Sequence, residues 1–193
     1  LDEAAVAALV PELQQQNVAS LAIGLLHAYA NPDHERRVRD IILAKHLPGE
    51  SISLSSEVCA EVREYDRFST TACNAYVQPL MAGYLERLSL QLKETGLACP
   101  LYLMLSGGGL AALETAMRFP IRLVESGPAG GAILAAGIAR ESGLSRVLSF
   151  DMGGTTAKIC LIDDFRPQAS RSFEIGRIYR FLGLTVGVIQ HDL

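Results

Sequence analysis

The hydrophobic and polar positions of the N-terminal part predict alternating helices and strands. Residues 2–16 carry apolar side chains at helical spacing, and Pro11 within them predicts a kink or break. Residues 18–27 form a near-continuous apolar run, which is typical of a strand covered on both faces. Asn31, followed by proline, predicts the start of a second helix, and the alternation over residues 51–55 predicts a second strand. This order indicates an α/β unit.

A long helix is predicted next, ending at Gly96. Its apolar positions run from residue 77 to residue 92, and Pro79 places the start of its regular part near that proline. The residues before it, 58–69, are rich in charge, and we interpret residues 63–67 as a solvated loop with internal ion pairs. Acid/base groups facing a cleft are the alternative for this cluster, and nothing local decides between them.

The region after Gly96 alternates between extended and helical patterns. Residues 100–105 predict a strand, and residues 106–109, Ser-Gly-Gly-Gly, predict a turn into a short helix over residues 110–117. Such a loop either cradles an anion at a helix N-terminus or is a plain tight turn. Further on, residues 120–124 are expected to be extended and residues 173–181 to pair as a strand.

The strongest chemical signal is a glycine turn between two apolar stretches, spanning residues 146–163. Gly153 and Gly154 can adopt φ values that other residues resist, and a backbone without Cβ atoms can press its N–H groups against an anion. Asp151 precedes them as a candidate metal-binding carboxylate, and two hydroxyl donors follow, Thr155 and Thr156. This pattern predicts a phosphate-binding hairpin open to a cleft, although the same residues also suit a hairpin without a ligand.

A helix of small residues is predicted just before this hairpin, over residues 128–139, with Pro128 at its first position. Glycines lower helix propensity, so Gly130 and Gly131 predict close packing against another element or a ligand. A small-residue helix followed by an Asp-Gly-Gly-Thr hairpin resembles the second half of the actin, sugar-kinase and heat-shock ATPase superfamily. The expected fold class is therefore α/β, with incomplete ribonuclease H-like lobes.

Composition narrows the classes of partner and compartment. Hydrophobic residues make up 49% of the 193-residue chain and the net charge is −4, so nucleic acid is an unexpected partner. The longest apolar run, residues 18–30, is too short to span a bilayer, and no membrane association is expected. The four cysteines are far apart in the sequence and lack the paired spacing of a metal site. We therefore expect reduced thiols and a cytoplasmic protein. His27, at the end of the apolar run, is interpreted as a hydrogen-bonded core residue, and a catalytic or ligand role is the alternative.

Several motifs together resemble the hydantoinase A/5-oxoprolinase family. The most specific is Phe150-Asp-Met-Gly-Gly-Thr-Thr156, and the others occupy residues 21–37, 55–58, 63–71, 74–77 and 126–131. The resemblance runs from about residue 18 to residue 180 and implies ATP-dependent opening of a cyclic amide such as a hydantoin or 5-oxoproline. It implies ATP and Mg²⁺ as cofactors, with phosphoryl transfer to the ring amide oxygen before hydrolysis.

The resemblance also divides the chain and assigns its site. Residues 1–70 are expected to end an N-terminal hydantoinase/oxoprolinase domain, and residues 71–193 to begin the hydantoinase A domain. Asp151 is the expected catalytic and metal-binding residue, and the expected nucleotide-binding residues are Gly130, Gly131, Gly153, Gly154, Thr155, Thr156 and Lys158. Lys158 stands where many members carry an acidic residue, so it either contacts phosphate or marks a subgroup with another substrate.

Both chain ends are interpreted as cuts through a larger protein, and the 193-residue piece alone is expected to be inactive. A hydantoinase B-type subunit or domain is a possible partner. Two other functions stay open: the ATP-lobe subunit of an acetone-carboxylase-type enzyme, and a non-catalytic nucleotide-binding remnant. An Asp-x-Gly-Gly-Thr hairpin upstream of this chain would favour the enzyme.

Overall fold

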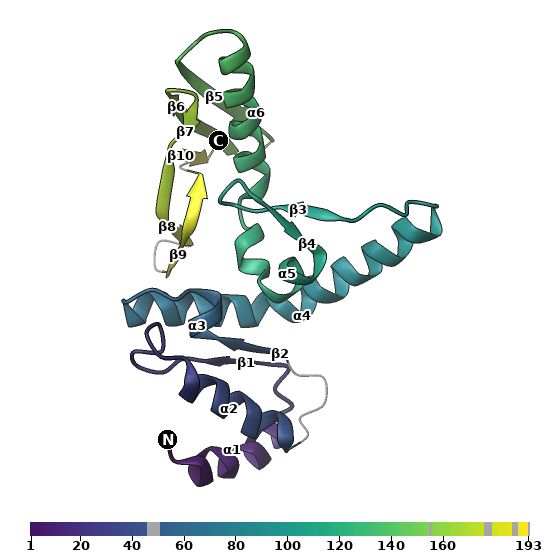
Figure 1. Cartoon of the computed structure of the whole chain (residues 1–193), viewed down its shortest axis with the longest axis vertical. Coiled ribbons are helices and arrows are strands. Elements are labelled where there is room, and N and C mark those ends of the chain that lie inside the picture. Colours follow the sequence, from purple (N-terminus) through teal and green to yellow (C-terminus); the bar gives the residue numbers. More distant parts are fainter. Residues whose placement is uncertain (46–50, 155, 176–178, 187–188, 193) are drawn as a thin grey trace. The chain divides into compact units, whose positions relative to one another are not determined.

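The computed structural model describes residues 1–45, 51–154, 156–175, 179–186 and 189–192 (Figure 1). It divides the chain into two compact units. Unit 1 comprises Leu1–Gly96, Met117–Ile121 and Glu174–Leu182, and unit 2 comprises Leu97–Ala116, Arg122–Phe173 and Gly183–Leu193. No helix within the described ranges combines the length and apolarity needed to cross a membrane.

Unit 1 is a small α/β layer structure. Its strands β1 (Ser20–Ile23) and β2 (Ser51–Leu54) pair in parallel, with Ser20 opposite Ser51 and Ile23 opposite Leu54. The long helix α4 (Glu64–Glu94) packs on both strands, and the sheet lies between it and α2 (Asp33–Ala44) with α1 (Glu3–Gln15) (Figure 1). A short helix, α3 (Ser55–Val58), continues from β2. Val10, Ile23, Ile42 and Leu54 form the core.

Local side chains begin α1 and α2 within one residue of the predicted helix starts. The Asp2 carboxylate accepts a hydrogen bond from the Ala5 N–H at 3.0 Å and caps α1. Asn31 accepts from the Asp33 N–H at 3.0 Å and turns the chain into α2. The helix–strand–helix–strand order predicted for this part of the chain is therefore confirmed.

The helix break predicted at Pro11 and the helix start predicted near Pro79 are both wrong. α1 continues through Pro11 without a break, because Val10 is buried in the core and Val6 and Leu13 pack around it. α4 starts at Glu64, well before Pro79, since Thr70, Thr71, Asn74 and Ala75 on its first half are buried. Tertiary packing outweighs the local cost of proline in each helix.

The strand predicted over residues 18–27 is also shorter than expected. β1 ends at Ile23, and the chain then turns around His27, which has a φ of 59°. His27 is exposed, so its interpretation as a core residue is wrong. The apolar run in the sequence extends beyond the end of β1, because Ala28 in the following turn is also buried.

Unit 2 is built around an antiparallel sheet and one helix. β5 (Arg146–Met152) pairs with β6 (Thr156–Asp163), which pairs in turn with β10 (Ile189–Asp192) and β7 (Arg166–Pro167). α6 (Ser126–Glu141) packs on β5, β6 and β7. Two further strands, β8 (Ala169–Ile175) and β9 (Tyr179–Val186), pair with each other, and each has residues in both units. The single strand predicted over residues 173–181 covers parts of both, and its residues 176–178 lie outside the described residues.

The predictions for residues 100–124 are partly wrong. β3 (Tyr102–Met104) lies within the predicted strand, but residues 106–109 connect it to a second strand, β4 (Leu110–Ala112), instead of opening a helix. They form a hairpin loop, so the anion-binding alternative for a helix N-terminus does not hold. The following helix, α5, is confined to Leu113–Arg118, and Pro120–Leu123 is a 3₁₀-helix instead of an extended piece.

Candidate functional site

The predicted hairpin at residues 146–163 is present. β5 and β6 pair without a break from Arg146 opposite Asp163 to Met152 opposite Ala157. Gly153 and Gly154 lie in the connection, and the Gly153 N–H donates to the Thr156 carbonyl at 2.9 Å. The prediction of two adjacent antiparallel strands joined at these glycines is confirmed. Thr155 lies outside the described residues.

The glycine backbone at the tip of the hairpin is open on its outer side. A Cβ atom built on Gly154 would meet nothing within 4 Å, and one on Gly153 would meet only the Thr156 carbonyl oxygen at 3.9 Å. Both glycines are exposed. The backbone here is therefore accessible to a ligand, as the phosphate hypothesis requires.

The pairing register places Asp151 and Lys158 on the same face of the sheet. They are directly opposite each other, and antiparallel partners project to the same side. Cys160 and Ile162 share this side because they follow Lys158 at intervals of two, and both are buried. The other side carries Leu148, Phe150, Met152 and Leu161, which are all exposed. Asp151 and Lys158 therefore belong to the face that α6 covers.

Lys158 forms an ion pair that the sequence did not predict. Its Nζ lies 2.7 Å from the Glu125 carboxylate, and both side chains are mostly buried, with exposures of 19% and 26%. Glu125 immediately precedes α6 and has a left-handed backbone, with a φ of 61°. The only sequence signal was its position directly before Ser126-Gly-Pro128. No side-chain pattern distinguishes this glutamate from an ordinary residue of a helix first turn.

The small-residue helix exists, but its packed face differs from the predicted one. Its buried residues are Ala129, Ala132, Ala136 and Ala139, which recur at helical spacing. Gly131 is exposed with nothing within 4 Å of a built Cβ, and Gly130 approaches only the Met104 side chain at 3.8 Å. The prediction that Gly130, Gly131 and Ala135 form the packing face is wrong, because the buried stripe of the helix runs through the alanines at positions 129, 132, 136 and 139. The helix also begins at Ser126, two residues before the predicted start at Pro128.

The charges at the hairpin suit a phosphate bound with a divalent cation. Asp151 is exposed, and no hydrogen bond or ion pair among the described residues engages its carboxylate. The described residues contain no cluster of three or more potential metal-binding side chains. Mg²⁺ in nucleotide sites needs only one or two carboxylates, since phosphates and water complete its coordination. A single free carboxylate beside a glycine turn therefore fits such an ion.

A cysteine lies next to this site but does not add a nucleophile. Burial raises the pKa of the Cys160 thiol, so the thiol is even less often ionised than an exposed cysteine. The thiolate is the reactive form. The groups available at the hairpin are thus a carboxylate, an ion-paired ammonium group and backbone N–H groups.

Unit 1 contains a second polar cluster, which is fully buried. The Glu35 carboxylate accepts from the Ser55 hydroxyl at 2.5 Å and from the N–H groups of Leu25 and Ser56, both at 2.9 Å. Arg67 donates to Ser55 at 3.2 Å and to the Leu25 carbonyl at 3.1 Å. Arg67 is therefore an internal clamp, and its interpretation as part of a solvated loop is wrong.

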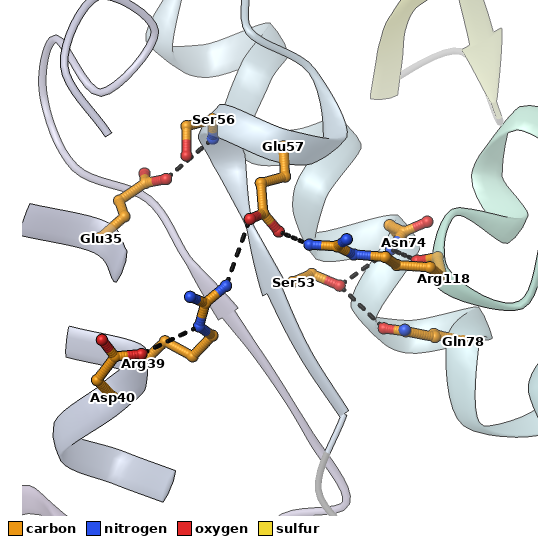
Figure 2. Close-up of polar contacts among 9 residues, drawn as sticks. All are labelled: Glu35, Arg39, Asp40, Ser53, Ser56, Glu57, Asn74, Gln78 and Arg118. Carbon is orange, nitrogen blue, oxygen red and sulfur yellow. Dashed lines mark hydrogen bonds and ion pairs between the residues drawn. The ribbon is translucent and has the colours of Figure 1, made fainter. Parts of the chain in front are cut away.

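A neighbouring set of contacts holds residues 118–121, and Figure 2 draws those of Asn74 with Ser53 and Arg118 and those of Glu57 with Arg39 and Arg118. The Asn74 amide donates to Ser53 at 2.9 Å and to the Arg118 carbonyl at 3.1 Å, and its carbonyl accepts from the Ile121 N–H at 3.2 Å. Glu57 pairs with Arg39 at 3.3 Å and with Arg118 at 2.5 Å. The motifs at residues 55–58, 63–71 and 74–77 thus contribute to scaffolding within unit 1.

Comparisons with known proteins agree with this architecture. The hydantoinase/oxoprolinase family model matches residues 67–187, and the model of the hydantoinase/oxoprolinase N-terminal region matches residues 1–46. The caprolactamase subunit alpha of Pseudomonas jessenii is 34% identical over 97% of this chain and 26% of its own length. The 5-oxoprolinase of Saccharomyces cerevisiae is 31% identical over 86% of this chain and 12% of its own length.

Solved structures are similar over nearly the whole chain. An ATP-dependent caprolactamase from Pseudomonas jessenii superposes with a TM-score of 0.89 at 33% identity, covering 98% of this chain and 27% of that one. A nucleotide-free acetone carboxylase gives a TM-score of 0.84 at 26% identity, covering 100% and 27%. The fold is that of α/β enzymes that use ATP. This chain belongs to the hydantoinase/oxoprolinase family, and it spans about a quarter or less of the length of these relatives.

Proposed function

We propose that this chain supplies the phosphate-gripping hairpin of an ATP-dependent hydrolase that opens a cyclic amide. The observation that carries the proposal is the β5–β6 hairpin, with an exposed carboxylate at Asp151 and two open glycines at its tip. Relatives named as an ATP-dependent caprolactamase and a 5-oxoprolinase support the substrate class. We propose an actin-like lobe for this part of the protein, because a hairpin of this kind grips phosphates in that superfamily.

Each group at the hairpin has a role in the proposed phosphoryl transfer. The N–H groups around Gly153 and Gly154 hold phosphate oxygens, and the hydroxyls of Thr155 and Thr156 add donors. Asp151 holds Mg²⁺, which compensates the negative charge that develops on the transferred phosphoryl group. Lys158 supplies a positive charge on the same face. We retain Gly130 and Gly131 as proposed nucleotide contacts, since a ligand can approach the exposed backbone of Gly131 closely.

The amide chemistry follows from the phosphoryl transfer. The ring amide oxygen attacks the terminal phosphoryl group, ADP leaves, and the O-phosphorylated ring carbon becomes electrophilic. Water then adds to that carbon and the ring C–N bond breaks, which leaves an acyl phosphate. A second water hydrolyses the acyl phosphate to a carboxylate and releases phosphate. The ring nitrogen gains a proton, so the products are an open-chain amine or urea with a carboxylate, together with ADP and phosphate.

The first test removes the Asp151 carboxylate from the longer protein that we propose contains this chain. Asp151→Asn should lower ATP-dependent ring opening by about 100-fold or more, because the developing phosphoryl charge loses its compensation. Amide product and phosphate are measured together, with circular dichroism to check that the fold is intact. An Asp151→Asn protein with normal turnover would remove this carboxylate from the site.

The 193-residue chain by itself is expected to show no ATP turnover. The superfamily grips the nucleotide with two hairpins, and this chain carries one of them. Purified chain and longer protein are compared under identical conditions. Robust ATP hydrolysis by the 193-residue chain would contradict the two-hairpin mechanism.

The acetone-carboxylase type is the second candidate, favoured by the structural similarity to acetone carboxylase. It uses the same hairpin but delivers phosphoryl groups to a carboxylation reaction. Relatives named as subunits also support a proposed partner subunit, of the hydantoinase B type for a hydrolase. Ring opening of a lactam, a hydantoin or 5-oxoproline without bicarbonate favours the hydrolase, whereas turnover that requires bicarbonate and a ketone favours the carboxylase.

A further inference from the structure

Glu125 combines features that an ordinary helix-start residue does not need. Its backbone is left-handed with a φ of 61°, a conformation that is energetically unfavourable for residues with a Cβ atom. Its side chain makes no capping hydrogen bond to α6, although it occupies the N-cap position. The carboxylate turns instead to Lys158, at 2.7 Å. The side chain therefore contacts a residue of β6 and does not cap the helix that it precedes.

This ion pair determines where the Lys158 ammonium group lies. Lys158 is opposite Asp151 in the pairing register, on the face of the sheet that α6 covers. A lysine side chain has four rotatable bonds, and the Glu125 carboxylate selects one placement for it. Because both side chains are mostly buried, solvent screens their attraction less than it would screen a surface pair. The Lys158 ammonium group is therefore held at the Glu125 carboxylate, on the face of the sheet that also carries Asp151.

We propose that Glu125 is a positioning residue for nucleotide turnover, acting through Lys158. It holds the Lys158 ammonium group on the face of the sheet that carries Asp151, so that the cation is in place for a phosphate group of the nucleotide. A metal-binding role for Glu125 is disfavoured, because its carboxylate already faces an ammonium group. This inference rests on the proposed function of the hairpin, and it adds a residue from outside the hairpin to that site.

A double-mutant cycle in the longer protein tests whether Glu125 acts through Lys158. The variants are Glu125→Gln, Lys158→Met and the two combined. Glu125→Gln should lower kcat/KM for ATP about 10- to 100-fold, the range typical of residues that support a directly acting group. The double variant should match Lys158→Met within about twofold, because Glu125 has nothing left to position. KM for the cyclic substrate should not change.

Glu125→Gly separates the side chain from the backbone. Glycine adopts the left-handed conformation without strain, so this variant removes the carboxylate while it leaves the backbone turn intact. It should nevertheless lose as much ATP turnover as Glu125→Gln, because Lys158 loses its partner. If Glu125→Gly is fully active, or if the Glu125→Gln and Lys158→Met losses multiply, the positioning role is wrong.

Amine labelling distinguishes failure of this inference from failure of the proposed function. Lys158 should react with acetic anhydride several times more slowly in the wild type than in Glu125→Gln, as quantified by peptide mass spectrometry. Slow labelling in a wild type that never turns over ATP confirms the ion pair but overturns both the proposed function and the positioning role. Equal labelling in wild type and Glu125→Gln overturns the ion pair itself. Normal wild-type turnover that Glu125→Gln leaves unchanged overturns only the positioning role.

Discussion

Gly24 follows β1 where the chain turns, and among the glycines described in unit 1 it is the one at which an added Cβ would clash most clearly. A Cβ built on Gly24 would lie 2.5 Å from Cδ1 of the Phe68 ring. That ring lies beneath the Arg67 guanidinium group, whose Cζ is 5.0 Å from the ring centroid. Arg67 in turn holds the Leu25 carbonyl. Adding one methyl group here therefore disturbs the buried clamp as well as the ring.

We predict that Gly24→Ala lowers the free energy of unfolding by about 1–3 kcal/mol, as overpacking does. Gly109→Ala is the matched control, because a Cβ there would meet nothing within 4 Å. Urea denaturation of both variants gives the comparison. Equal stabilities for the two variants would mean that the Phe68 ring moves aside without cost.

At the scale of elements, α6 was predicted correctly as a helix, but the face that it buries was predicted incorrectly. Its small residues predict close packing, and close packing occurs, but through the alanines and not the glycines. Ala136 is 6% exposed, whereas Gly131 is exposed and lies outside the packed face. Because successive helical residues are separated by about 100°, an error of one position in the buried face exchanges packed and free residues.

We predict opposite effects for two leucine substitutions on α6. Ala136→Leu should lower the free energy of unfolding by about 1–3 kcal/mol, because the larger side chain has no room against the sheet. Gly131→Leu should leave stability unchanged or raise it by up to about 1 kcal/mol, since leucine favours the helix more than glycine. Thermal unfolding measures both. A large loss of stability for Gly131→Leu would restore the glycine face as the packed one.

At the scale of the whole molecule, unit 1 is discontinuous in sequence. The segment Met117–Ile121 belongs to it, although the residues immediately before and after belong to unit 2. Asn74 holds this segment through the Arg118 carbonyl and the Ile121 N–H, and Glu57 holds the Arg118 side chain. Asn74 is fully buried, so these hydrogen bonds are shielded from water.

We predict that Asn74→Ala destabilises unit 1 by about 2–4 kcal/mol, because it leaves the buried Ile121 N–H and the Arg118 carbonyl without this partner. Hydrogen exchange of the Ile121 amide should accelerate in the same variant. Gln78→Ala is the control, since Gln78 accepts from the same Ser53 hydroxyl at 3.1 Å, whereas the hydrogen bonds to Arg118 and Ile121 come from Asn74. If the two variants exchange at the same rate, Asn74 does not anchor residues 117–121.

Short sequence patterns predicted those elements of this protein whose structure depends on residues close together in the sequence. Apolar spacing identified α1, α2, the end of α4 and α6, and the glycine turn identified the β5–β6 hairpin. Motif order identified the family. These features depend on capping, periodicity and turn chemistry, which act within a few residues. Asp151, the two glycines and Lys158 were therefore recognisable as a candidate site from the amino-acid sequence alone, and their catalytic roles stay predictions.

Only the tertiary structure decided which side chains meet across long separations. Pro11 and Pro79 stay inside helices because buried neighbours hold those helices in place. Arg67 is a buried clamp and not a solvated charge, because Ser55 and the Leu25 carbonyl approach it from distant segments. Glu125 reaches Lys158 across 33 positions. A sequence pattern records which residues are apolar or charged, but the partner that satisfies a buried charge is determined by packing.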